Sequence, residues 1–252
     1  MRQERWQKLL AAALALAVWQ GVSMLVHSPI LLPSPLRVAA RLAVLVPTAD
    51  FWSVIGFSLV RIAGGFLLAL IAATALAFLA GRFSLAEILL RPYVLAIKSV
   101  PVASFIILAL IWLRTSQLSL FISFLMVFPV LYTNVLAGIR SANGQLLEMA
   151  RVFRVPWSRR LRMIYLPAVE PFLLAGSATA LGMSWKAGVA AEVIGVVAGS
   201  LGERLYDAKI YLQTADLLAW TVVIVAMSAG FEWLMLRLLR RVFRTLGGDA
   251  AC

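Results

Sequence analysis

The residues that could carry out acid–base, nucleophilic or metal chemistry are few in this chain of 252 residues. His27 is the only histidine, and Cys252, the last residue, is the only cysteine. Catalysis needs acids, nucleophiles or metal ligands that converge, and the acidic residues here are scattered. The sequence therefore predicts no catalytic site, no metal site and no internal disulfide.

A motif for ATP binding is also missing from the sequence. A P-loop requires Gly-x-x-x-x-Gly-Lys-Ser/Thr, in which a lysine follows a glycine. None of the four lysines does so; they are Lys8, Lys98, Lys186 and Lys209. We expect no cofactor on this chain, and any ATP-driven step would need a separate polypeptide.

Several charged residues fall inside apolar stretches, where an ionisable side chain is costly and by default a functional candidate. Arg61, Lys186 and Glu192 are such residues, whereas Lys98 is expected to extend its amine to a membrane interface. An anionic substrate would prefer Arg61 or Lys186 to Glu192. With Trp185, which precedes Lys186, these three residues are the predicted substrate-pathway residues.

Small residues recur every four positions before Glu192, at Gly176, Ala180, Ser184 and Gly188. Such a ridge lets two helices approach closely. Close packing in the bundle or at a dimer interface is the favoured interpretation. The alternative is that the ridge lines a pathway whose wall includes Trp185 and Glu192.

One long segment, residues 140–167, is polar and basic. Asn143 is placed to cap a first helix, in which Leu146, Ala150 and Phe153 share one face. Pro156 is expected to open a second helix, in which Trp157, Leu161 and Ile164 repeat that spacing and which Pro167 ends. Such apolar faces indicate docking to a partner. An amphipathic hairpin that only lies on the membrane surface is the alternative.

The composition tells which elements must position these residues. Hydrophobic residues make up 63% of the chain and charged residues 13%, which is typical of a polytopic membrane protein. We predict an all-α fold with about six spans, because a spanning helix needs about 20 apolar residues. Pro33 and Pro35 predict an extended turn before a short surface helix over 37–46. The predicted spans are residues 9–26, 54–80, 93–113, 117–139, 168–198 and 214–236.

The positive charges predict the orientation of these spans. Of the 23 Lys and Arg residues, 15 fall on the side of the N-terminus, 5 on the other side and 3 inside spans. Cationic loops stay in the cytoplasm, so both termini and segment 140–167 are expected there. The net charge of +12 then reflects membrane topology and not binding to nucleic acid. A cleaved signal peptide is the alternative for the first stretch.

The spacing in the basic segment resembles the EAA signature of permease subunits of ABC importers. That signature is Glu-Ala-Ala, three residues, Gly, nine residues and Ile-x-Leu-Pro. Here it reads Glu148-Met149-Ala150, Arg154 at the glycine position, and Ile164-Tyr165-Leu166-Pro167. Arg154 departs from the family, because glycine there implies a backbone conformation costly to other residues.

Further short motifs resemble the nitrate/sulfonate/taurine-type branch of that family, and together they cover about residues 30–240. They are Leu32-Pro33-Ser34-Pro35, Ser58 to Phe66, Arg91-Pro92, Val100-Pro101, and Trp185 with Val189 to Glu192.

The resemblance implies a type I ABC importer permease in the bacterial inner membrane, with one transmembrane domain over residues 1–252. It implies a homodimer with a second permease copy, cytoplasmic ABC ATPase subunits that bind ATP and Mg, and a periplasmic or lipid-anchored solute-binding protein. The substrate would be a small anion of the sulfonate, nitrate or taurine type, or a related molecule. Residues 245–252 are expected to be a disordered tail. The implied ATPase-coupling residues are Glu148, Ala150, Arg151, Phe153, Arg154, Trp157, Ile164, Leu166 and Pro167.

Two other classes of protein compete with this interpretation. An ATP-independent secondary transporter would need coupling-ion sites at the membrane midplane, and it has no use for a basic hairpin. A membrane enzyme would need a cluster of reactive side chains. Whether a P-loop ATPase binds to the chain separates these classes from the favoured one.

Overall fold

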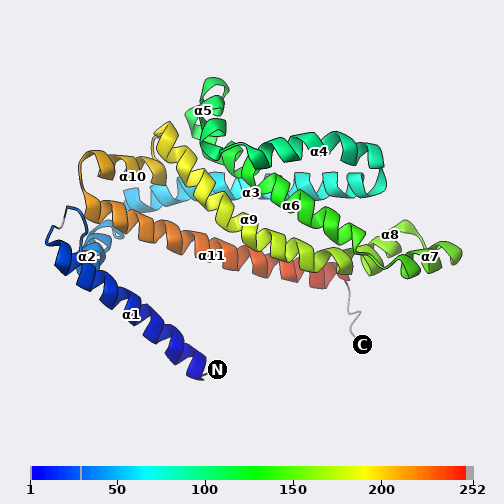
Figure 1. Cartoon of the computed structure of the whole chain (residues 1–252), viewed down its shortest axis with the longest axis horizontal. Helices are drawn as coiled ribbons and strands as arrows, with labels where there is room; N and C mark the ends of the chain where they lie inside the picture. Colours follow the sequence, from blue (N-terminus) through cyan, green and yellow to red (C-terminus); the bar gives the residue numbers. More distant parts are fainter. Residues whose placement is uncertain (1, 29, 248–252) are drawn as a thin grey trace.

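A computed structural model of the chain describes residues 2–28 and 30–247, and its regular elements are all helical (Figure 1). They are α1 (Arg2–Val26), α2 (Pro35–Leu45), α3 (Ala49–Arg82), α4 (Ser84–Ser99), α5 (Val102–Trp112), η1 (Thr115–Gln117), α6 (Leu118–Arg140), α7 (Gly144–Val152), α8 (Trp157–Arg160), η2 (Leu161–Tyr165, a π-helix), α9 (Leu166–Gly195), α10 (Leu201–Ile210) and α11 (Thr214–Gly247).

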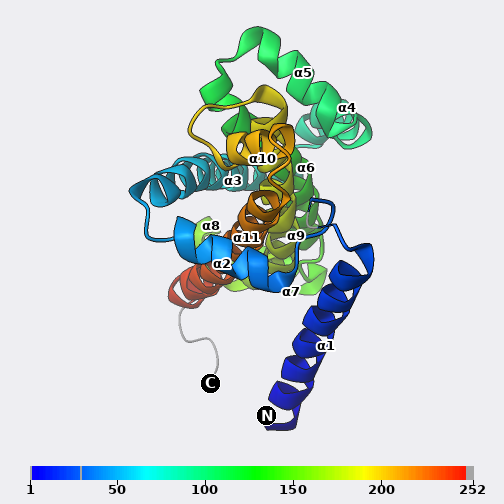
Figure 2. The ribbon, with the colours of Figure 1, turned by 90° about the vertical axis from the view of Figure 1, so that its left-hand side faces the viewer.

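Four predicted spans correspond to long apolar helices. Among the described residues, α3, α6 with η1, α9 with the elements before it, and α11 are long and apolar enough to cross a membrane. The first predicted span lies in α1, of which Ala13–Val26 is a shorter apolar helix. In both views α1 projects away from the other helices (Figures 1 and 2). The prediction of an all-α membrane protein is confirmed.

The predicted span 93–113 is not one straight helix. It consists of the end of α4 and the whole of α5, which are bent by 106° at Val100 and Pro101. Proline has no backbone N–H, and it forces the preceding residue into extended conformation. Val100 has φ −84° and ψ 133°, as expected before Pro101. The prediction of a continuous span here was wrong because hydropathy does not register this break.

The short surface helix and the C-terminal tail were predicted with different success. α2 begins at Pro35 after an N-cap by Ser34, which confirms the predicted helix. Arg41 of α2 pairs with Asp216 of α11, and one of their contacts is 2.8 Å long. α11 continues to Gly247, so residues 245–247 are helical and not a disordered tail. Residues 248–252 lie outside the described part.

The core of the bundle lies where α3, α6 and α9 pack against one another. Ile62 and Phe66 of α3, Leu131 of α6, and Leu181 and Trp185 of α9 are at most 1% exposed. The small-residue ridge lies on this buried face of α9, because its four residues are all buried. The ridge therefore serves close packing, as favoured from the sequence.

Gly188 gives a direct test of this packing. A Cβ atom at Gly188 would lie 2.6 Å from Ile62 Cγ1 and 2.7 Å from Ser123 Oγ. We expect Gly188→Ala to lower the free energy of unfolding by about 1–3 kcal/mol, the usual cost of overpacking. The measurement is thermal unfolding of the detergent-solubilised protein. Gly182→Ala is the matched control: no atom lies within 4 Å of its Cβ position, so we expect unchanged or slightly higher stability. Equal melting temperatures for both variants would contradict this packing.

Candidate coupling hairpin and buried polar cluster

The 140–167 hairpin joins α6 to α9 and lies at the end of the bundle where α11 also ends (Figure 1). Ser158, Leu161 and Leu166 of the hairpin line a cavity of about 250 Å³ together with Thr245 and Leu246 of α11. The hairpin is therefore in contact with the transmembrane helices and is not a slack connector.

The first helix of the hairpin, α7, is capped at both ends. The Asn143 side chain accepts hydrogen bonds from the backbone N–H of Gln145 and Leu146, which confirms the predicted cap. At the other end, the Val155 N–H donates to the Ala150 carbonyl and the Arg154 N–H donates to that of Arg151, at 2.9 and 3.1 Å. This pair of bonds is a Schellman motif, which needs a left-handed residue.

Arg154 is that left-handed residue, with φ +51°. The turn therefore adopts the conformation that glycine favours, although an arginine occupies the position. A side chain in left-handed conformation costs about 1 kcal/mol relative to glycine. The backbone at Arg154 is therefore strained.

We expect Arg154→Gly to stabilise the hairpin by about 0.5–1 kcal/mol, because it removes this left-handed cost. The measurement is hydrogen exchange at the Val155 amide, whose bond to Ala150 closes the turn. Arg151→Gly, in the last turn of α7, should instead speed exchange, because glycine destabilises a helix interior. Faster exchange in Arg154→Gly would show that the arginine side chain stabilises the turn.

Apolar side chains on the first half of the hairpin are exposed. Val152 is 78% exposed and Phe153 is 73% exposed, and Leu146, Met149 and Trp157 are 42–51% exposed. Ala150, which was predicted to share a helical face with Leu146 and Phe153, is only 3% exposed. The exposed cluster is therefore Leu146, Met149, Val152, Phe153 and Trp157.

The second half of the hairpin continues directly into the membrane. α8, the π-helical turn η2 and α9 form one helical run from Trp157 to Gly195. The prediction that Pro167 ends the second helix was wrong, because Pro167 lies in the first turn of α9, where a missing N–H costs little. Ile164 and Leu166 are partly buried, and Tyr165 packs against the Trp157 ring at 5.6 Å between centroids.

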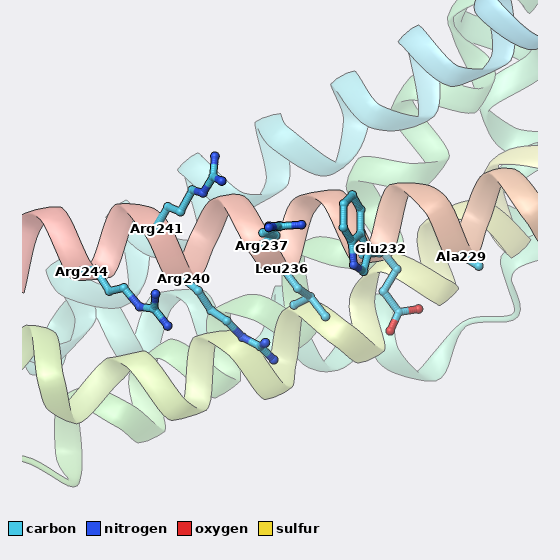
Figure 3. Close-up of a pocket in the computed structure, with 8 residues that line it drawn as sticks. Ala229, Glu232, Leu236, Arg237, Arg240, Arg241 and Arg244 are labelled. Carbon is cyan, nitrogen blue, oxygen red and sulfur yellow. The ribbon is translucent and has the colours of Figure 1, made fainter. Parts of the chain in front are cut away.

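Charged side chains surround the exposed cluster. Glu148 and Arg151 are exposed on α7. Nearby, α11 carries four arginines around a cavity of about 730 Å³, next to Glu232 (Figure 3). They are Arg237, Arg240, Arg241 and Arg244. This end of the bundle is therefore strongly basic.

The four predicted substrate-pathway residues do not form one site. Trp185 is 1% exposed and packs edge-on against Phe231, whereas the adjacent Lys186 is exposed. Arg61 Nε donates to the Ser116 carbonyl at 2.6 Å, and its guanidinium lies 3.4 Å above the Phe57 ring. None of the principal cavities among the described residues is lined by any of these four, which are Arg61, Trp185, Lys186 and Glu192.

Glu192 is fully buried in a polar cluster that joins three helices. Its Oε2 accepts a hydrogen bond from Ser58 Oγ of α3 at 2.8 Å and one from the Gly202 N–H of α10 at 3.2 Å. Ser58 Oγ in turn accepts from the Leu201 N–H at 3.0 Å. A Cβ at Gly202 would lie 2.3 Å from Glu192 Cβ, so only glycine permits this approach of α10 to α9. Glu192 thus holds α10 in place.

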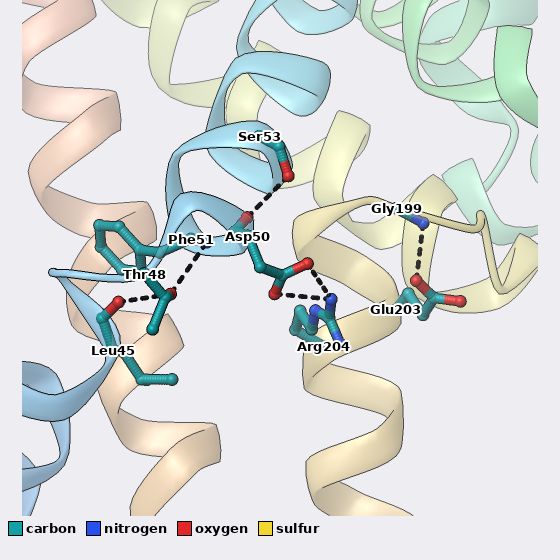
Figure 4. Close-up of polar contacts among 8 residues, drawn as sticks. All are labelled: Leu45, Thr48, Asp50, Phe51, Ser53, Gly199, Glu203 and Arg204. Atoms are coloured by element: carbon teal, nitrogen blue, oxygen red, sulfur yellow. Dashed lines mark hydrogen bonds and ion pairs between the residues drawn. The ribbon is translucent and has the colours of Figure 1, made fainter.

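Further polar contacts hold α10 from its exposed side (Figure 4). Arg204 donates to both carboxylate oxygens of Asp50, at 2.7 and 2.8 Å. Glu203 accepts from the Gly199 N–H at 2.6 Å, while its own N–H donates to Ser200 Oγ at 3.1 Å. These two hydrogen bonds of Glu203 resemble a capping box at the start of α10. α10 was not predicted from the sequence, although Ser200 and Glu203 have the spacing of a capping box.

Comparison with known proteins assigns the sequence to a family. Residues 65–244 match the family described as binding-protein-dependent transport system inner membrane component. A Bacillus subtilis (strain 168) protein named for aliphatic sulfonates transport, the permease SsuC, is 31% identical over 94% of this chain and 86% of its own length. The taurine transport system permease TauC of Escherichia coli (strain K12) is 28% identical, over 91% and 85%. The bicarbonate transport system permease CmpB of Synechococcus elongatus is 28% identical, over 78% and 70%.

Proposed function

Because the chain belongs to the family of binding-protein-dependent transport system inner membrane components, we propose that it forms the membrane pathway of an ATP-driven importer and couples that pathway to a separate ATPase subunit. The observation that carries this proposal is the exposed cluster on the hairpin. The five apolar side chains of this cluster are exposed on a segment that also carries six arginines.

Docking of an ATPase would use this exposed cluster. Large apolar side chains at the centre of an interface supply most of its binding energy, and Phe153 and Trp157 are the aromatic candidates. Glu148 and Arg151 would form the charged rim, and the turn at Arg154 presents Phe153. ATP and Mg would be bound by the ATPase, since this chain has no P-loop.

Transmission to the membrane would follow the helical run from Trp157 to Gly195. A force applied at the hairpin reaches α9 without crossing a flexible loop, because Ile164, Leu166 and Pro167 lie within this run. α9 packs against α6 and α3 in the core. Rigid-body movement of these helices is a common way to switch between two states.

The arginines support a cytoplasmic location of the hairpin. Four arginines on α11 and six on segment 140–167 lie at the same end of the bundle, and cationic segments stay in the cytoplasm. ATP is available on that side. We therefore propose that both termini are cytoplasmic, with α2 and α10 at the outer side.

The remaining partners follow from the family. A second copy of this chain would form a homodimer, and exposed apolar side chains on α4, such as Leu85, Ile88 and Leu89, are available for contact with it or with lipid. A periplasmic or lipid-anchored solute-binding protein would deliver the substrate. Relatives are named for aliphatic sulfonates, taurine and bicarbonate, so we propose a small anion as the substrate.

Uptake into membrane vesicles tests the energy source. Vesicles that contain the whole transporter are loaded with ATP and supplied with radiolabelled taurine and the solute-binding protein. We expect uptake to need internal ATP and to persist when a protonophore collapses the proton gradient. Uptake that needs the gradient and not ATP would support the ATP-independent secondary transporter instead.

A further inference from the structure

We propose that the groove between α4 and α6 binds the anionic group of the transported substrate, with Lys98, Thr133 and Tyr132 as its contacts. This inference rests on the proposed function and adds a substrate site to it. The groove has a volume of about 830 Å³, enough for a small organic anion. It is distinct from the four residues that the sequence had indicated for the pathway.

The groove runs from the basic end of the bundle toward the middle of the membrane. Arg91 of α4 and Arg140 of α6 line it near the hairpin, and Lys98 and Thr133 line it further in. Lys98 follows Arg91 by seven residues in α4, and Thr133 precedes Arg140 by seven residues in α6. Lys98 and Thr133 therefore lie about 10 Å further from the basic end than the two arginines. The two helices run in opposite directions, which brings Lys98 and Thr133 together at 3.4 Å between Nζ and Oγ1.

The charges that line the groove favour an anion. Its charged lining residues are Arg91, Lys98, Arg140 and Glu87, which give a surplus of positive charge. Glu87 is already paired with Arg140. Among the described residues neither Arg91 nor Lys98 has a carboxylate partner. The amine of Lys98 is thus available to a substrate, and Arg91 adds positive potential near the mouth.

A buried hydroxyl supplies an independent observation. Tyr132 lines the same groove, is only 3% exposed, and its hydroxyl has no hydrogen-bond partner among the described residues. An unsatisfied buried hydroxyl is costly, and one in a native structure calls for an explanation. Phe128 stacks against the Tyr132 ring at 6.0 Å and holds it in position. The hydroxyl itself is enclosed, but the residue lines the groove, so a small shift of its side chain would let it donate this hydrogen bond to a bound anion.

Apolar side chains complete the lining. Val94, Leu95 and Leu136 face the groove beside the polar contacts. The combination suits a compact anionic head, such as a sulfonate or carboxylate, attached to a short carbon chain. The helix break at Val100 and Pro101 follows Lys98 directly, so α4 ends just beyond the proposed contact.

The test uses the whole transporter, with its ATPase and solute-binding protein, and radiolabelled taurine. We expect Lys98→Met to lower the maximal uptake rate roughly ten-fold or more, the usual effect of losing a charged hydrogen bond. The KM should change little, because the binding protein captures the substrate. Lys98→Arg should retain most of the rate. Lys209→Met, which removes an exposed lysine of α10 outside the groove, should transport like the wild type.

Tyr132→Phe separates a binding role from a structural one. It removes a hydroxyl that makes no contact in the protein, so the melting temperature should not fall, whereas maximal uptake should fall several-fold. Normal uptake by both Lys98→Met and Tyr132→Phe would overturn the groove assignment while leaving the proposed function intact. A loss of uptake in Tyr132→Phe that follows a loss of thermal stability would also overturn it. A wild-type transporter that takes up none of taurine, aliphatic sulfonates, nitrate and bicarbonate would contradict the anion substrate itself.

Discussion

Phe153→Asp is expected to reduce transport to less than about a tenth of the wild-type rate. The Phe153 side chain is 73% exposed at the tip of the hairpin, beside the left-handed Arg154. Loss of a central aromatic contact typically costs an interface 2 kcal/mol or more, and a buried carboxylate adds a desolvation cost. The measurement is ATP-dependent taurine uptake, normalised to the amount of permease in the membrane.

The matched control is Phe83→Asp, which makes the same change at another exposed phenylalanine. Phe83 lies between α3 and α4, outside the hairpin, and is 54% exposed. We expect this variant to transport at close to the wild-type rate. If the two variants lose equal activity, the loss is caused by a negative charge near the membrane surface and not by disruption of the exposed cluster.

Glu192→Ala is expected to have the largest effect on stability. The substitution leaves the Ser58 hydroxyl and the Gly202 N–H without their acceptor inside the protein. Each unsatisfied buried group costs about 1–3 kcal/mol, so the loss of both acceptors should lower the free energy of unfolding by about 2–6 kcal/mol. Thermal unfolding in detergent measures the loss, and proteolysis near α10 shows whether that helix has come free.

Glu192→Gln distinguishes a structural role from contact with the substrate. Glutamine keeps an oxygen that can accept from Ser58 and Gly202, so both stability and uptake should stay close to wild type. If Glu192→Gln keeps its stability but loses uptake, Glu192 acts in the pathway, as first inferred from the sequence, and not only as the residue that positions α10.

Local signals in the sequence predicted much of the hairpin. Asn143 and Pro156 mark helix starts by well-defined backbone chemistry. The glycine position of the signature drew attention to the turn at Arg154, but only the structure shows that the residue is left-handed. The burial of Ala150 was not predictable from periodicity, because it depends on what packs against α7 in the fold.

The membrane part was predictable as helices but not in its interior contacts. Hydropathy continues across Val100 and Pro101, so the 106° bend was missed although the proline was visible. Glu192 was identified because an ionisable residue in a span is costly. Its partners were not, because they lie on α3 and α10, which are separate elements of the chain. For the same reason Tyr132 gave no signal, since only the fold shows that its hydroxyl is unpartnered.

Copurification tests the central claim most directly. The tagged permease is extracted from its native membrane in mild detergent, and the P-loop ATPase that accompanies it is quantified for the wild type and for Phe153→Asp. We predict ATPase subunits in equal numbers to wild-type permease chains, and their loss from Phe153→Asp while that variant stays folded. A transport-competent wild-type preparation without any ATPase, or an undiminished amount of ATPase on Phe153→Asp, would contradict the assignment of the hairpin as the coupling surface.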